Sequence, residues 1–142
     1  MALISDDVAA ELEREFQNLK NPVRLLVFSQ ALAVPESEEV RRLVEELAGL
    51  DSRIRTLSYN FVIDKDQVDA VGIARIPAIA VMGEDKDYGL RMYGLPQGYE
   101  FGSLVDAILD VSSGESGLLD ETKAALQALD KPVHIQVFST PT

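Results

Sequence analysis

The sequence predicts an α/β domain with a mixed four-stranded sheet and helices on both faces. Short apolar runs, typical of buried strands, alternate along the chain with segments whose apolar residues recur at helical spacing. A helix separates the first two predicted strands, which therefore run parallel, whereas only a polar turn separates the last two. The predicted order of elements is α-β-α-β-α-β-β-α.

The first half of this pattern supplies two helices and the central strand. The first helix is expected to begin at Ser5 or Asp6, because either side chain can accept a hydrogen bond from the first turn. Residues 23–28 then form a nearly all-apolar run, which predicts a central strand. A second helix is predicted over residues 36–47, with Gly49 as its C-terminal cap.

The second half supplies the rest of the sheet. The remaining predicted elements are a strand, a short helix, a hairpin of two strands and a helix, which cover residues 54–61, 64–70, 78–82, 88–93 and 99–111. Pro77 immediately precedes the third strand, a position at which a proline does not interrupt the hydrogen bonds of a sheet.

The charge of the chain limits the partners that it can have. The 142 residues carry a formal net charge of −11, with 24 acidic side chains against 13 basic ones. Such a surface repels phosphate backbones and anionic lipids, so we expect no nucleic-acid or membrane partner. No apolar run is long enough to cross a bilayer, and residues 1–5 lack the basic start of a secretory signal. A cytoplasmic location is therefore expected.

The chain has no cysteine, which excludes disulfides, thiolate metal sites and cysteine nucleophiles. The single histidine, His134, alternates with apolar neighbours and lies beside Gln136 on the polar side of a predicted strand. The acidic groups at 64–69 and 84–87 lack the spacing and the turn glycine of a calcium loop. No catalytic residue, no metal ligand and no cofactor is therefore predicted.

The C-terminal region repeats the start of the chain. Residues 131–139 follow the pattern of residues 21–29, in which a proline precedes alternating apolar residues and then a phenylalanine and a serine. Pro22 and Pro132 are 110 positions apart, an offset typical of one small domain. The preceding segments align at the same offset, with Val8, Phe16 and Leu19 matched by Leu118, Leu126 and Leu129.

This repeat predicts the domain organisation. We interpret residues 1–113 as one complete unit, residues 114–117 as a linker, and residues 118–142 as the opening helix and strand of a truncated second unit. Because burial of each large apolar side chain is worth about 1.5–3 kcal/mol, the apolar strand at 133–138 should not stay in water. We expect it to dock on its own domain or on a neighbouring copy, which would give a homo-oligomer through this strand.

Several motifs carry a resemblance to a known family. They are Leu3-Ile4-Ser5-Asp6, Asn21-Pro22-Val23-Arg24, Arg75-Ile76-Pro77-Ala78 and the turn Gly94-Leu95-Pro96-Gln97-Gly98 with Tyr99-Glu100-Phe101. With them the chain resembles the glutaredoxin-like protein disulfide oxidoreductases of thermophilic prokaryotes, which are built from two thioredoxin folds in tandem. The N-terminal part of bacterial alkyl hydroperoxide reductase flavoproteins is a more distant relative. The resemblance implies a thioredoxin-like fold.

The resemblance also identifies the positions of a redox motif whose cysteines are missing from this chain. The family's Cys-x-x-Cys motif lies at the start of the helix that follows the first strand, where the helix N-terminus stabilises a thiolate. In this chain, these vestigial positions are Val34, Pro35, Glu36 and Ser37. Pro77 matches the cis-proline of the fold, so Ile76 and Pro77 are the expected binding residues, opposite Val34 to Ser37. In the family, a second Cys-x-x-Cys follows the segment that matches Phe138–Thr142.

Three hypotheses about function follow. The favoured one is a redox-silent domain, the N-terminal part of a protein disulfide oxidoreductase, which acts as a scaffold or substrate-docking unit for a second thioredoxin-like unit. The alternative is a stand-alone module that binds a protein or peptide through the cis-proline loop. The third is an enzyme of another chemistry, for which the sequence offers no set of residues.

Overall fold

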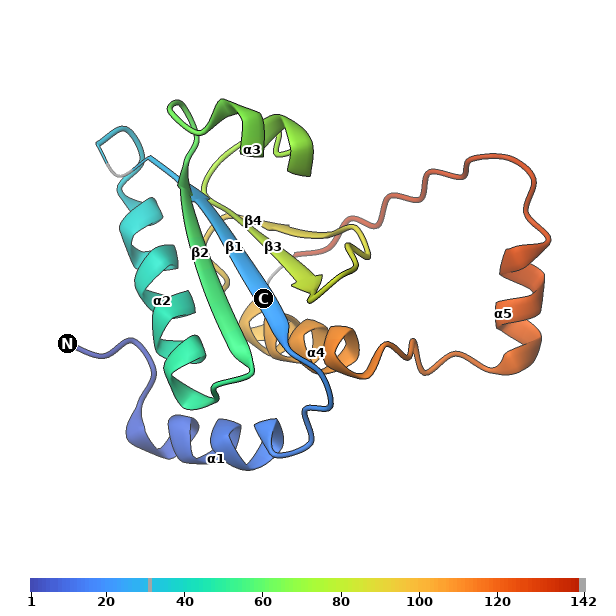
Figure 1. Cartoon of the computed structure of the whole chain (residues 1–142), viewed down its shortest axis with the longest axis horizontal. Coiled ribbons are helices and arrows are strands. Elements are labelled where there is room, and N and C mark those ends of the chain that lie inside the picture. The colour runs from blue at the N-terminus through green and yellow to red at the C-terminus, as the bar shows by residue number, and fades with distance from the viewer. Residues whose placement is uncertain (31, 141–142) are drawn as a thin grey trace.

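The computed structural model of the chain describes residues 1–30 and 32–140. It contains one four-stranded sheet with the strand order β2-β1-β3-β4, surrounded by helices (Figure 1). The elements are α1 (Asp6–Phe16), β1 (Val23–Ser29), α2 (Glu36–Leu50), β2 (Ile54–Asn60), α3 (Lys65–Val71), β3 (Ala78–Gly83), β4 (Leu90–Tyr93), α4 (Tyr99–Ser113) and α5 (Asp120–Gln127).

The sheet is mixed, as the sequence predicts. β1 pairs with β2 in parallel, with Val23 opposite Ile54, and with β3 in antiparallel, with Phe28 opposite Ala78. β3 and β4 form the predicted antiparallel hairpin. β1 is thus the central strand, and β2 and β4 are the two edges of the sheet.

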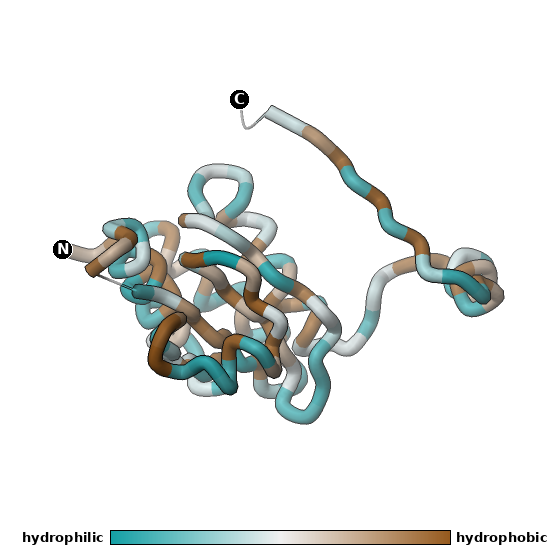
Figure 2. Tube along the Cα trace, turned by 90° about the horizontal axis from the view of Figure 1, so that it is seen from above, coloured by the Kyte–Doolittle hydropathy of each residue, from teal (hydrophilic) through white to brown (hydrophobic). Residues whose placement is uncertain are grey.

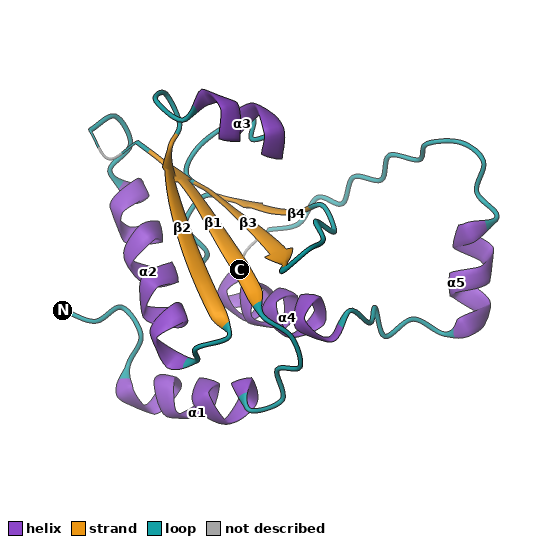
Figure 3. Ribbon diagram, viewed as in Figure 1, coloured by secondary structure: helices purple, strands orange, loops and turns teal. Residues whose placement is uncertain are grey.

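Helices cover both faces of the sheet, unequally (Figure 3). On one face, α1, α2 and α4 enclose the larger core cluster, whose β1 members are Val23, Leu25 and Val27. On the other face, α3 covers a smaller cluster that contains Leu26 and Phe28. The alternation of β1 side chains between the two clusters explains why nearly every position of this strand is apolar.

Several predicted boundaries need correction. Gly49 does not cap α2, because the helix continues to Leu50, whose partly buried side chain packs on the larger core. β4 begins at Leu90, two residues later than predicted, because the turn before it extends through Gly89, which has a φ of 84°. Ser5 caps α1 as expected, and its hydroxyl accepts a hydrogen bond from the Val8 N–H at 3.5 Å. Within the described ranges, no helix is both long and apolar enough to span a membrane.

A buried serine joins the end of α4 to the segment between α1 and β1. Ser112 is almost completely buried, and its Oγ accepts hydrogen bonds from the N–H groups of Lys20 and Asn21 at 2.9 and 3.0 Å. The same hydroxyl donates to the Asn21 carbonyl at 2.7 Å. This single side chain therefore satisfies three backbone groups that have no partner in a helix or strand.

Replacement of Ser112 by alanine is expected to lower the free energy of unfolding by about 2 kcal/mol, because backbone groups would lose their partners away from water. Urea unfolding followed by circular dichroism measures this loss. Ser113→Ala is the control, since the neighbouring hydroxyl bonds only to exposed groups on its own turn, and a change below about 0.5 kcal/mol is expected. Equal losses in the two variants would contradict the role assigned to Ser112.

Arg91 forms an ion pair within the β3–β4 hairpin and a hydrogen bond that attaches the hairpin to α3. The Arg91 guanidinium lies 2.6 Å from the Asp87 carboxylate and also donates to the Val71 carbonyl at 3.0 Å. The hydrogen bond from Arg91 outweighs partial burial and lowers the pKa of Asp87 to about 2. Asp87 therefore stabilises the fold above its unfolded pKa of about 3.9, and this stabilisation is lost as the pH falls towards 2.

Asp87→Asn is accordingly expected to be about 1 kcal/mol less stable than the natural chain at neutral pH, a value that allows for solvent screening of a carboxylate that is 40% exposed. The difference between the two proteins should close between pH 4 and pH 2. Thermal unfolding across this range measures it. A difference that does not change with pH would mean that the carboxylate charge contributes nothing.

The C-terminal region (residues 118–140, here called the tail) differs from the expectation. The predicted second-unit helix is present as α5, but residues 133–138 do not form a strand. Of the two outcomes expected for the tail, docking on its own domain does not occur, since α5 has no buried residue and Ile135, Val137 and Phe138 are 80–90% exposed. A single extended segment has no partner for its backbone groups, so no strand forms. Figure 2 shows the tail projecting from the domain, with apolar and polar residues alternating along it.

Candidate functional site

The candidate site lies at the end of the sheet where β1 and β2 finish and β3 begins, which we call the Pro77 end. Phe28 pairs with Ala78, so Pro77 lies beside the last residues of β1. The Phe61 N–H donates to the Ser29 carbonyl at 3.0 Å, which joins the loop after β2 to the same place. Three connecting segments far apart in sequence therefore meet at this end.

The Val34 to Ser37 segment forms the turn that leads into α2. The Val34 N–H donates to the Gln30 carbonyl at 2.9 Å, and the Ser37 N–H donates to the Val34 carbonyl at 3.0 Å. The Ser37 side chain is completely buried, and its Oγ accepts a hydrogen bond from the Gln30 N–H at 3.2 Å. The position that matches the second cysteine of the motif thus holds a serine. Its buried hydroxyl links the start of α2 to the end of β1.

The first turn of α2 is acidic. Glu36, Glu38 and Glu39 lie in this turn, where carboxylates interact favourably with the helix dipole. A hydrogen bond from Arg41 also lowers the pKa of Glu38. The turn thus has the charge that suits a helix start, whereas a thiolate beside these carboxylates would be disfavoured.

The Pro77 segment has the conformation that the resemblance implies. The Ile76–Pro77 peptide bond is cis. The Pro77 carbonyl accepts a hydrogen bond from the Gly94 N–H at 2.9 Å, which ties the segment to the loop between β4 and α4. The Arg75 guanidinium lies 4.4 Å from the centre of the Tyr93 ring. Both predicted parts, Val34 to Ser37 and Ile76–Pro77, therefore lie at one end of the sheet.

Exposed apolar side chains surround this end. Leu32 follows β1 and is fully exposed, while Val62 and Ile63 follow β2 and are 60% and 79% exposed. Sequence analysis did not single out these residues. Their signal is an apolar side chain in the loop directly after each of two parallel strands, because parallel strands finish at the same end of a sheet. Together they give the Pro77 end an apolar rim.

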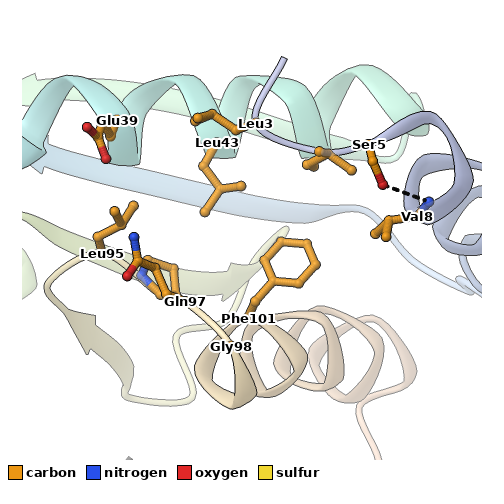
Figure 4. Close-up of a pocket in the computed structure, with 11 residues that line it drawn as sticks. Leu3, Ser5, Val8, Glu39, Leu43, Leu95, Gln97, Gly98 and Phe101 are labelled. Carbon is orange, nitrogen blue, oxygen red and sulfur yellow. Dashed lines mark hydrogen bonds between the residues drawn. The ribbon is translucent and has the colours of Figure 1, made fainter. Parts of the chain in front are cut away.

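A pocket of about 440 Å³ adjoins the site (Figure 4). Leu43 of α2 and Phe101 of α4 point into it from opposite sides, with Leu95 beside them and Glu39 at the rim. Its size and mainly apolar lining are typical of ligand pockets. Two walls of this pocket begin near the Pro77 end. One wall, on α2, starts with Glu39, two residues after Ser37. The other starts with Leu95, next to Gly94, whose N–H bonds to the Pro77 carbonyl. We call it the strap pocket.

The third wall of the strap pocket is the segment before α1, residues 1–5, which we call the strap. Both oxygens of the Glu46 carboxylate accept hydrogen bonds from the strap, from the N–H groups of Leu3 and Ile4 at 2.8–2.9 Å. Arg42 donates to the Met1 carbonyl. Partial burial raises the pKa of Glu46, but the hydrogen bonds from Leu3 and Ile4 outweigh it, and the net pKa is lowered.

The Pro77 end and the strap pocket present mainly apolar surface. The Cys-x-x-Cys positions hold no thiol, and the strap pocket offers an apolar floor with a carboxylate at its rim. In the part of the chain that the structure describes, no group of three or more acidic, histidine or cysteine side chains could hold a metal ion. His134 lies in the tail and is exposed.

The sheet order, the helix after β1 and the cis-proline before β3 define a thioredoxin-like fold, and comparisons with solved structures support this class. The chain is similar to the N-terminal domain of alkyl hydroperoxide reductase AhpF from Enterococcus faecalis, at 26% identity and a TM-score of 0.80 over 90% of this chain and 62% of that one. It is also similar to a protein disulfide oxidoreductase from Aeropyrum pernix, at 28% identity and a TM-score of 0.78 over 88% and 55%.

Curated protein sequences are also similar to this chain. The AhpF protein of alkyl hydroperoxide reductase from Xanthomonas campestris pv. phaseoli is 34% identical over 100 residues, which cover 70% of this chain and 16% of the relative. A Bacillus subtilis protein named NADH dehydrogenase is 30% identical over 110 residues, which cover 78% and 19%. The chain thus spans about a fifth of the length of these relatives. No family model matches it.

The predicted resemblance is confirmed. The chain is a thioredoxin-like domain related to the N-terminal domain of AhpF and to protein disulfide oxidoreductases.

Proposed function

We propose that this chain is a redox-silent thioredoxin-like domain, the N-terminal part of a protein of the disulfide oxidoreductase type. In this role it is not itself an enzyme. It serves as a scaffold and as a docking unit that holds an extended polypeptide for a catalytic thioredoxin-like unit. Its partners are that second unit and the polypeptide, and no nucleic acid or membrane is involved.

The observation that carries the proposal is Ser37. A serine occupies the position of the second cysteine, and its completely buried side chain accepts a hydrogen bond from the Gln30 N–H. The loop is therefore built to keep its shape without a disulfide. The fold keeps the apolar rim and the Pro77 segment, which are the parts that contact a polypeptide, and lacks only the thiols.

The place of the domain in a longer protein has separate support. The repeat at an offset of 110 residues matches the start of a second unit of the same kind. The solved relatives extend beyond the matched region, since the chain covers 62% of the AhpF domain and 55% of the disulfide oxidoreductase.

Docking can be tested with reduced, S-carbamidomethylated insulin B chain as the polypeptide probe. Titrated into the labelled full chain, it is expected to shift NMR signals of residues 32–37, 62–63 and 76–77. Ile63→Asp should weaken binding about tenfold or more, because an exposed apolar contact is lost and a charge repels the probe. Leu119→Asp is the matched control, since Leu119 is 75% exposed but lies in the tail.

Equal binding by the Ile63→Asp and natural chains, or shifts confined to other surfaces, would overturn the docking role. The scaffold role would then stand alone, and its test is a direct interaction with a separately produced catalytic thioredoxin-like unit.

A second candidate is a stand-alone module that binds a protein or peptide through the cis-proline loop. The observation in its favour is the strap pocket, which is large enough to hold apolar side chains and lies next to the Pro77 end. This chain forms the pocket by itself, so no second unit is needed for binding. The two candidates differ in one respect. The stand-alone module would bind the insulin probe with full affinity and would not associate with a catalytic unit.

A further inference from the structure

The strap pocket has a single charged side chain in its described lining. This residue is Glu39, which lies at the rim and is exposed (Figure 4). Its neighbour Glu38 is paired with Arg41, and Arg42 donates to the Met1 carbonyl, but no described basic group forms an ion pair with Glu39. A free carboxylate on a chain with a net charge of −11 attracts a cationic group.

The rest of the pocket is mainly apolar. Leu43 and Phe101 point into it from opposite sides, and Leu3 and Val8 lie beyond them (Figure 4). Leu3 and Val8 are 44% and 39% exposed, so part of their apolar surface is still open to a ligand. A volume of about 440 Å³ is within the range of ligand pockets and suits a large apolar side chain. The pocket therefore fits an apolar group that lies close to a cation.

The start of α4 favours a polypeptide as the source of these groups. Gly98, the N-cap of α4, lines the pocket, and no side chain caps this helix in the part of the chain that the structure describes. The N–H groups of Glu100 and Phe101 donate to backbone carbonyls of the preceding turn. The Tyr99 N–H has no acceptor among the described residues. A peptide carbonyl can accept from such an open amide, whereas a simple amine has no carbonyl to offer.

We infer that the polypeptide docked at the Pro77 end has a basic residue next to a large apolar residue. The basic group lies at Glu39, and the apolar side chain enters between Leu43 and Phe101. One extended chain can reach both places, because two walls of the strap pocket begin near the Pro77 end. This inference rests on the proposed docking role and adds the class of polypeptide that is recognised.

Three acetylated hexapeptide amides test the inference. They are Gly-Ser-Phe-Lys-Ser-Gly and the two versions in which glutamate replaces the lysine or glycine replaces the phenylalanine. In NMR titrations of the labelled full chain, the first peptide should bind about fivefold more tightly than either of the others. It should also shift the signals of Leu43, Leu95 and Phe101. High salt should reduce the preference for lysine over glutamate, because salt screens charges at an exposed rim.

A charge reversal at the rim tests the role of Glu39. Glu39→Lys should weaken binding of the phenylalanine–lysine peptide and strengthen binding of the phenylalanine–glutamate peptide. Glu13→Lys is the matched control, since it makes the same change of charge at an exposed position of α1 outside the pocket lining, and it should keep the original preference. Both side chains are exposed, so the two variants should fold normally.

The outcomes separate this inference from the docking role. If the S-carbamidomethylated insulin B chain docks at the Pro77 end but the lysine and glutamate peptides bind equally, the inference is overturned and the docking role stands. A preference for lysine that survives Glu39→Lys, or shifts confined to residues outside the strap pocket, also overturns it. If neither the insulin B chain nor any of the three peptides binds, the docking role fails and the inference fails with it.

Discussion

Replacement of Val34 and Ser37 together by cysteine is expected to give this chain a disulfide-reducing activity where the natural chain has none. The natural sequence has no cysteine and so no thiolate to attack a disulfide. The two positions lie where β1 leads into α2, and a helix start lowers the pKa of a thiol. Turnover of insulin with dithiothreitol as the reductant measures the gain.

The single variant Val34→Cys is the control. It should form a mixed disulfide with the substrate but should not turn over, because the second thiol that releases the substrate is missing. Glu36, Glu38 and Glu39 oppose thiolate formation, so the rate of the double variant should rise when these residues are neutralised. If the double variant keeps both thiols free under mild oxidation, the placement of the vestigial motif is wrong.

Phe28→Ala is expected to have the largest effect on stability, a loss of about 3–5 kcal/mol in the free energy of unfolding. Phe28 is completely buried on the α3 face of the central strand, and its ring stacks on Tyr59 with the ring centres 5.3 Å apart. Alanine would leave a cavity between β1 and α3 that neighbouring strands cannot close. Because small domains are stable by about 5–15 kcal/mol, much of the variant could unfold at 37 °C.

Chemical unfolding measures this loss, and Leu57→Ala is its control. Leu57 lies on the same face of the sheet but is 42% exposed, so its truncation should cost less than about 1 kcal/mol. A loss of similar size in both variants would mean that the α3 face contributes little to the core.

Helical periodicity predicted the helices of the first unit because each helix has one buried side, and continuous apolar runs predicted β1 and β3, which are buried on both sides. Gly49 misled the prediction of the α2 boundary, because the packing of Leu50 outweighs the tendency of glycine to end a helix. The strand at 133–138 failed for a different reason. Its local pattern is correct, but a strand exists only with a neighbour, and local sequence does not provide one.

The candidate site could be predicted only in part. Val34 to Ser37 and Pro77 were found through short motifs, each of which lies in one stretch of sequence. The strap pocket was missed because its walls come from residues 3–8, 39–43 and 95–101, which no single pattern joins. The burial of Ser37 was missed too, since a serine near a helix start usually faces solvent and caps the helix.

The attachment of the strap to Glu46 has a consequence for the access of solvent to the pocket wall. The amides of Leu3 and Ile4 are held by a carboxylate and not by a helix or strand, so their hydrogen exchange reports directly on this one contact. Because the pKa of Glu46 is lowered, the contact persists in mild acid and opens only when the carboxyl gains a proton. At that point the two amides lose their acceptor, and their hydrogen exchange is expected to speed up.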